Sequence, residues 1–107
     1  MLPPELDDIL KRCKEALQNL YGDRFAGLVL YGSIARGDYN PESDIDLIVL
    51  LRGRVDPYAE IRPIVHALYR IQLESGRLIS ARAISARDYR SGDRVFLHNV
   101  RRDAVPV

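Results

Sequence analysis

Residues 30–50 read LYGSIARGDYNPESDIDLIVL and constrain the fold more than any other part of the chain. An apolar run leads into Gly32-Ser33, ten residues follow, and a second apolar run begins around Asp44 and Asp46. Short apolar runs bounded by glycine and polar residues are typical of buried strands. The stretch therefore predicts two strands joined by a polar loop, with glycine and serine at one end of the loop and two carboxylates at the other.

The predicted helices and strands continue on both sides of this stretch. Apolar residues recur at helical spacing over residues 5–20, which predicts an amphipathic helix with Cys13 as a buried core thiol. The further predictions are strands at 25–31, 44–51 and 77–85, a helical turn at 33–36, a helix from Asp56-Pro57 to Glu74 with a kink or a fresh start at Pro63, and one or two short helices after Ser85. This order predicts an α/β (α+β) domain with a small sheet flanked by helices.

Size and charge set limits on the class of protein. A chain of 107 residues has the size of one domain, so we expect residues 1–107 to form a single domain. A net charge of +1 gives no bulk attraction for nucleic acid or for a membrane surface, and we expect direct binding to neither. No run approaches the ~18 apolar residues of a membrane span, and the acidic N-terminal residues differ from a signal peptide. With a single cysteine, these features predict a cytoplasmic protein.

The Gly32-Ser33 pair carries groups that suit an anion. Glycine lets the backbone approach a ligand closely, free N–H groups at the start of a helical turn point outward, and the Ser33 hydroxyl adds a donor. Gly-Ser pairs also occur in ordinary turns, so this pair alone does not identify a phosphate site.

Asp44 and Asp46 are candidate metal ligands. Residues two apart on a strand project from the same face, so the two carboxylates would lie side by side. Close carboxylates on a mostly buried strand repel each other, and a divalent cation would remove that penalty; oxygen ligands suit Mg²⁺ or Mn²⁺. The alternative is that the pair lies at the solvent-exposed start of the strand, where Asp44 caps a turn.

The run GSIARGDYNPESDIDL strongly resembles the signature of the DNA polymerase β-like nucleotidyltransferase superfamily, in the form carried by the minimal nucleotidyltransferases. Gly32-Ser33, ten intervening residues, Asp44 and Asp46 match its motif, and residues 35–37 and Ser43 match its commoner accessory positions. The resemblance implies a mixed sheet and the transfer of an NMP group, AMP from ATP in the expected case, to an acceptor hydroxyl with release of pyrophosphate.

The resemblance also implies a role for each site residue. Gly32 and Ser33 would grip the triphosphate, and Asp44 and Asp46 would be catalytic residues that bind two divalent metals, Mg²⁺ or Mn²⁺. Arg36 is a further candidate for contact with phosphate, with a salt bridge that braces the loop as the alternative.

One departure from the family pattern concerns the strand at 77–85. Active members place a third carboxylate on the corresponding strand, where it helps to activate the acceptor hydroxyl, but this strand contains no acid. Arg82 falls near the expected position, whereas Asp88 and Asp93 lie beyond the strand and Glu74 lies before it. An arginine there could neutralise the aspartates in place of a metal.

Three functions therefore stay open. Minimal nucleotidyltransferases resembling this chain are typically paired with a small helical HEPN protein, often as antitoxin and toxin, and some attach AMP to a tyrosine of that partner. The first hypothesis is thus an active transferase that modifies a protein partner. The second is a catalytically weak or dead nucleotide-binding module that acts by contact with its partner. The third is a transferase for a small molecule, with an acceptor site completed by a homo-oligomer.

Overall fold

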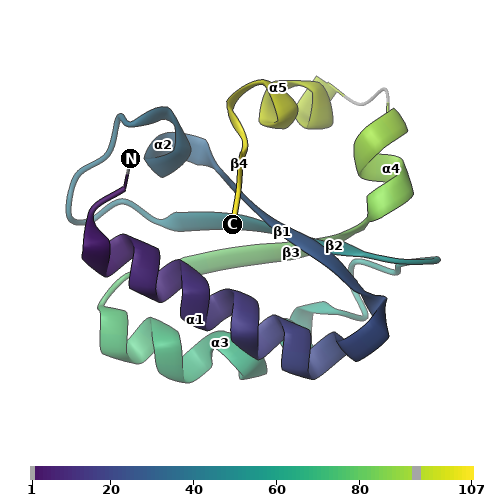
Figure 1. The fold of residues 1–107 in the computed structure, drawn as a ribbon, viewed down its shortest axis with the longest axis horizontal. Coiled ribbons are helices and arrows are strands. Elements are labelled where there is room, and N and C mark those ends of the chain that lie inside the picture. The colour runs from purple at the N-terminus through teal and green to yellow at the C-terminus, as the bar shows by residue number, and fades with distance from the viewer. Residues whose placement is uncertain (1, 93–94) are drawn as a thin grey trace.

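In the computed structural model, which describes residues 2–92 and 95–107, four strands form one sheet in the order β3-β2-β1-β4 (Figure 1). β2 pairs antiparallel with β1 and parallel with β3, and β4 adds to the other edge of β1 in antiparallel fashion. The mixed α/β fold expected from the sequence is confirmed. The strands are β1 (Phe25–Tyr31), β2 (Ile45–Leu51), β3 (Ile79–Ser85) and β4 (Val105–Pro106).

Helices cover both faces of the sheet. Two long helices, α1 (Pro4–Tyr21) and α3 (Ile61–Ser75), lie side by side on one face (Figure 1). Three shorter ones lie on the other face: α2 (Gly32–Arg36), α4 (Ala86–Ser91) and α5 (Val95–Asp103). A 3-10 turn at Gly22–Arg24 joins α1 to β1, and α3 provides the crossover that a parallel β2–β3 pair requires.

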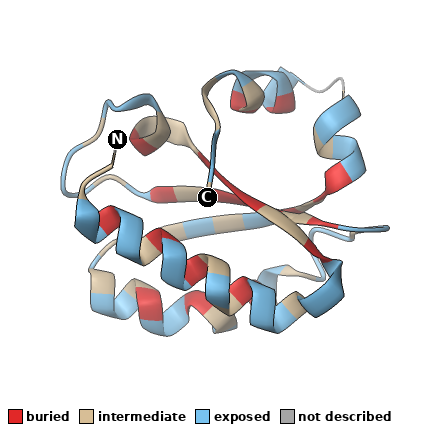
Figure 2. Ribbon diagram, in the orientation of Figure 1, coloured by how far each residue is buried: buried red, intermediate tan, exposed pale blue. Residues whose placement is uncertain are grey.

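The larger core fills the space between the sheet and the two long helices. Alternate residues of β1 and β2 point to this side, and the buried sides of α1 and α3 meet them (Figure 2). A smaller cluster on the opposite face contains Val29, Ile48 and Val100 beneath α5. On that second face Tyr31 and Asp46, near α2, are only half-buried. The part of the sheet beside α2 is therefore the part that a ligand can reach.

The predicted helix that starts at Asp56-Pro57 was placed too early, because α3 begins at Ile61. Asp56 caps a preceding turn instead, and its Oδ1 accepts a hydrogen bond of 3.0 Å from the Tyr58 amide. Pro63 is the third residue of α3, where a backbone N–H would have no partner in the helix. Pro63 therefore lies in the first turn of α3, and residues 52–60 contain no earlier helix for it to interrupt.

Two smaller features complete the fold. β4 was not predicted, because a strand of two residues is too short to show an alternating pattern. Cys13 is buried in the core as expected, and its burial raises the pKa of the thiol to about 12. Within the described residues, no helix combines the length and the apolar character needed to cross a bilayer. The cytoplasmic location and the single-domain organisation of residues 1–107 stay predictions.

The packing of α1 gives a matched test of this core. Leu17 is 0% exposed beneath the sheet, whereas Leu20 on the same helix is 41% exposed. We expect Leu17→Ala to lower the free energy of unfolding by about 2–5 kcal/mol, because it leaves a cavity that the surroundings only partly fill. Leu20→Ala is expected to cost about 1 kcal/mol or less. Urea unfolding followed by circular dichroism measures both, and equal costs would contradict this packing of α1.

Candidate functional site

Strand pairing places the glycine of the Gly-Ser pair directly against Asp46. Tyr31, the last residue of β1, pairs with Asp46 of β2, and Gly32 follows with a φ of +79°. A Cβ atom on residue 32 would collide with Asp46 Oδ2 and would lie 3.2 Å from its Cγ. Glycine is thus required both by the left-handed backbone and by the carboxylate that occupies the space of a side chain. Ser33, the next residue, is half-buried in the first turn of α2.

Hydrogen bonds hold the loop between α2 and β2 in a fixed shape. The Asp38 amide donates to the Ser33 carbonyl at 3.0 Å, which closes the end of α2. The Asn40 amide donates to Ser43 Oγ at 2.9 Å, and Arg77 Nη1 donates to the Ser43 carbonyl at 2.9 Å. These bonds fix the backbone immediately before the first of the two aspartates.

The two aspartates lie close enough to affect each other's ionisation. Burial raises the pKa of Asp46 above its usual value, and the negative charge of Asp44 raises it further. The positive charges of Arg36 and Arg82 act in the opposite direction without cancelling the rise. The site therefore holds a carboxylate that is costly to ionise in the metal-free protein. A bound cation would remove this cost.

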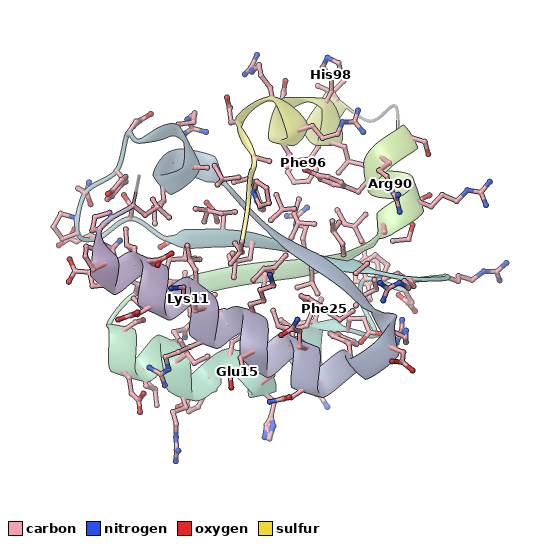
Figure 3. The ribbon with its side chains drawn as sticks, viewed as in Figure 1. Lys11, Glu15, Phe25, Arg90, Phe96 and His98 are labelled. Carbon is pink, nitrogen blue, oxygen red and sulfur yellow. The ribbon has the colours of Figure 1, made fainter. Side chains whose placement is uncertain are left out.

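The neighbouring strands contribute an aromatic side chain and a cationic side chain to the face of the sheet that carries Asp46. Across the sheet, Tyr31, Asp46 and Ser80 form one row of paired residues, and Arg82 lies two residues beyond Ser80 on β3. The Arg82 guanidinium lies over the ring of Phe96 from α5, 4.7 Å from its centroid. Phe96 in turn meets Tyr31 edge to face, with 5.9 Å between ring centroids. Figure 3 shows Phe96 reaching from α5 toward the sheet, whereas His98 points away.

The structure brings together some of the predicted site residues but not all. Gly32, Asp44 and Asp46 meet at one end of the sheet. Arg36 is exposed, and its Nε lies 3.6 Å from Asp38 Oδ2, the loop-bracing ion pair that was the alternative to phosphate contact. Its charge still acts on Asp46.

The acids considered near the third strand do not complete the site. Ser80 is the residue paired with Asp46, so β3 presents a hydroxyl and then an arginine on this face. Asp88 lies in α4, where its amide donates to the Ser85 N-cap, and Asp93 lies outside the described residues. Within residues 2–92 and 95–107, no three His, Cys, Asp or Glu side chains gather closely enough to hold a metal ion.

Sequence reasoning missed the aromatic members of this site. Tyr31 was assigned only as the end of a strand, and Phe96 only as part of a closing helix. Their partnership depends on how α5 folds back over β1, and no local pattern encodes that. The register of β1 and β2 would have placed Tyr31 beside Asp46 had the pairing been known.

Comparison with known proteins relates this chain to proteins named as adenylyltransferases. It is 33% identical over 76 residues to "Putative protein adenylyltransferase MJ0141" of Methanocaldococcus jannaschii. The aligned region covers 71% of this chain and 76% of the relative. It is 36% identical over 69 residues to "Putative protein adenylyltransferase MJ1305" of the same organism, covering 61% of this chain and 44% of the relative. The chain thus spans less than half the length of this second relative.

Family and structural comparisons point the same way. Residues 10–86 match the family described as "Nucleotidyltransferase domain". A crystal structure titled as a "putative nucleotidyltransferase from Sulfolobus solfataricus" superposes with a TM-score of 0.60 at 19% identity, covering 95% of this chain and 81% of that one. A structure titled "putative minimal nucleotidyltransferase" gives 0.58 at 21% identity, covering 95% of both chains. At these identities the structural likeness concerns the fold.

Two glycines have nearly the same backbone conformation, so substitutions at them can distinguish the cost of a left-handed residue from the cost of a steric clash. Gly32 and Gly37 have φ values of +79° and +80°, but a Cβ on residue 37 would meet nothing within 4 Å. We expect Gly37→Ala to cost about 1–2 kcal/mol, the penalty of a left-handed residue with a side chain. Gly32→Ala is expected to cost more, because it also displaces the Asp46 carboxylate. Thermal unfolding compares the two, and a smaller cost at residue 32 would contradict the contact with Asp46.

The raised pKa of Asp46 predicts that its ionised carboxylate lowers the stability of the folded protein. Because the folded state holds the Asp46 proton more tightly than the unfolded state, ionisation at neutral pH reduces stability. We therefore expect Asp46→Asn to unfold at a higher temperature than the wild type at pH 7 without metal. The advantage should shrink as pH falls through the pKa of folded Asp46, since the wild-type carboxyl is then neutral too. Melting temperatures over that range measure it; a less stable variant at pH 7 would disagree.

Proposed function

Because the chain belongs to the family described as "Nucleotidyltransferase domain", we propose that it acts as a minimal nucleotidyltransferase of the DNA polymerase β-like superfamily and transfers AMP from ATP to a hydroxyl group of a protein partner. The observation that carries this proposal is the contact between Gly32 and Asp46, which joins the expected phosphate-binding turn to the expected metal ligands.

The triphosphate is proposed to bind against the turn that begins α2. Gly32 has no side chain to hinder close approach of a phosphate, and the Ser33 hydroxyl is a hydrogen-bond donor. The loop that follows is braced from both ends, so the turn keeps its shape without a ligand. A preformed turn binds with less loss of conformational entropy than a mobile one.

Mg²⁺, or Mn²⁺, fits the residues that the site contains. Asp44 and Asp46 provide only oxygen ligands, and their mutual repulsion is the condition that a cation relieves. Two carboxylates are too few to enclose an ion, but Mg²⁺ is commonly held by one or two carboxylates together with substrate phosphates. When bound, the ion would neutralise the charge that develops on the phosphoryl oxygens.

The chain's own residues contribute to the transfer step by positioning the reacting groups. The oxygen of the acceptor hydroxyl forms a bond to the α-phosphorus of ATP, the bond from that phosphorus to the bridging oxygen breaks, and pyrophosphate leaves. The proton of the hydroxyl passes to solvent or to the departing pyrophosphate. Gly32 and Ser33 hold the phosphates in line, and Asp44 and Asp46 fix the ion-binding end of the site.

A protein partner is supported by the relatives' names and by an apolar stripe on α3. The relatives are named as protein adenylyltransferases. On the outer side of α3 four apolar residues four positions apart are each more than half exposed: Ile61, Val65, Tyr69 and Leu73. A continuous exposed stripe of this kind is typical of a surface that binds another protein. We propose a small helical HEPN-type protein as the partner, with this chain as its antitoxin.

A second candidate function follows from β3. With Ser80 and Arg82 where an acid was expected, the proton of the acceptor hydroxyl has no carboxylate on that strand to accept it. A nucleotide-binding module with weak or absent transfer, acting by contact with its partner, is the alternative that this observation favours.

Incubation of the purified protein with its partner, Mg²⁺ and ATP labelled on the α-phosphate tests the proposal. We expect label on the partner with the wild type and at least a hundredfold less with Asp44→Ala or Asp46→Ala, since removal of a group that stabilises transition-state charge typically costs about 10²–10³ in rate. Asp23→Ala is the matched control, because Asp23 is exposed at the opposite end of β1.

The two candidate functions give different results in this assay. ATP with Mg²⁺ that raises the melting temperature without any labelling supports the binding module, since a ligand must stabilise the folded state that binds it. No shift and no label would exclude both. Label that persists in the two aspartate variants would show that the site lies elsewhere.

A further inference from the structure

We infer that Arg82 binds the triphosphate tail of the nucleotide and is the specificity residue that distinguishes ATP from AMP. This inference rests on the proposed nucleotide site and adds to it a residue on β3. Arg82 is exposed, lies on the same face of the sheet as Asp46, and is oriented by an aromatic ring.

The strand register places Arg82 within reach of that site. Its partner on β2 is Ile48, two residues beyond Asp46, so the two side chains share a face about 7 Å apart along the strands and about 5 Å apart across them. The Arg82 guanidinium lies over the Phe96 ring, and that ring contacts Tyr31, the residue paired with Asp46. An arginine side chain spans such a distance.

The side chains around Arg82 orient its guanidinium but form no hydrogen bonds with its N–H groups. The group lies over the Phe96 ring, a contact that uses the flat face of the guanidinium and leaves the N–H groups at its edge available. Phe96 is itself fixed by its edge-to-face contact with Tyr31. Among the described residues, no carboxylate lies within ion-pair distance of Arg82, and no hydrogen bond from its side chain is formed.

Phosphate is the ligand chemistry that such a group fits best. A guanidinium presents paired N–H donors that match two oxygens of one phosphate, and charge-assisted bonds of this kind are the strongest that a side chain offers. Arg36, the other cation near Asp46, is engaged with Asp38 in the loop. Within residues 2–92 and 95–107, Arg82 thus differs from Arg36 in having no acidic partner, and its donors remain for a ligand.

A purely structural role for Arg82 is the competing account. If Arg82 only offset the charge of Asp46, its removal would leave the carboxylates less compensated, and binding of the triphosphate with its cation would stay the same or become stronger. If Arg82 binds phosphate, its removal weakens binding of the triphosphate and leaves AMP binding nearly unchanged. The two accounts thus predict different changes in the affinity for the triphosphate.

Isothermal titration calorimetry with Mg²⁺ and an ATP analogue carrying a methylene group between its α and β phosphates separates them. We expect Arg82→Ala to weaken binding of the analogue by about tenfold or more, and Arg82→Lys to recover part of the loss, because lysine keeps the charge without the paired donors. Binding of AMP should change by less than about threefold, because AMP lacks the β and γ phosphates and surface substitutions away from a contact usually have effects of about this size or smaller. Phe96→Leu, which removes the ring that orients the guanidinium, should fall between the wild type and Arg82→Ala.

Arg54→Ala provides the matched control. It removes the same charge from an exposed position just beyond the opposite end of β2, so its affinity for the analogue should equal that of the wild type. Circular dichroism confirms that each variant is folded before titration.

The outcomes are distinguishable. Unchanged binding of the analogue in Arg82→Ala would overturn the role of Arg82 while leaving the proposed function intact, as would equal losses for the analogue and AMP. Wild-type protein that binds neither nucleotide would contradict the proposed function and this inference together.

Discussion

The site depends on one contact, that between the backbone of Gly32 and the carboxylate of Asp46. The antiparallel register of β1 and β2 determines it, because Tyr31 pairs with Asp46 and the next residue must turn away in the left-handed region. Any shift of that register by one residue would send Asp46 to the opposite face, into the core beneath α1 and α3. The packing of the larger core and the geometry of the site are therefore set by the same strand pairing.

Stability and function oppose each other at this end of the sheet. The face beneath α5 is closed by Val29, Ile48 and Val100, but the part beside α2 leaves a half-buried carboxylate with a second one nearby. Apolar side chains there would extend the smaller cluster at no electrostatic cost. That the chain instead keeps two acids, a glycine and an exposed arginine in this place is typical of a surface shaped by a ligand rather than by folding.

Much of the fold was predictable from local pattern, and the exceptions have physical causes. The strand at Phe25–Tyr31 and the helix α1 follow from periodicity and apolar runs, because their signals lie within a few residues. The start of α3 was misplaced because Asp56-Pro57 begins a turn with the same signals as a helix. Of the candidate site, Gly32, Asp44 and Asp46 are predicted from the motif spacing and Arg82 from its place on the third strand, and their roles stay predictions. The contacts of Arg82 with Phe96 and of Phe96 with Tyr31 could not be predicted, since they join three segments far apart in sequence, and the pairing of Ser80 with Asp46 required the register of β3.

The exposed apolar stripe of α3 lies on the far side of the sheet from Asp46, and the layers of the fold are stacked along the intermediate axis of the molecule, which measures 28 Å (Figure 1). A partner seated on α3 therefore cannot present an acceptor from the anchored segment itself. A flexible segment of roughly 26 residues has a root-mean-square length of about 28 Å, enough to pass around the edge strand β3. Anchoring on one face and reaction on the other would then raise the local concentration of the acceptor through tethering, and would select partners by the length of a tail rather than by the sequence around the modified residue.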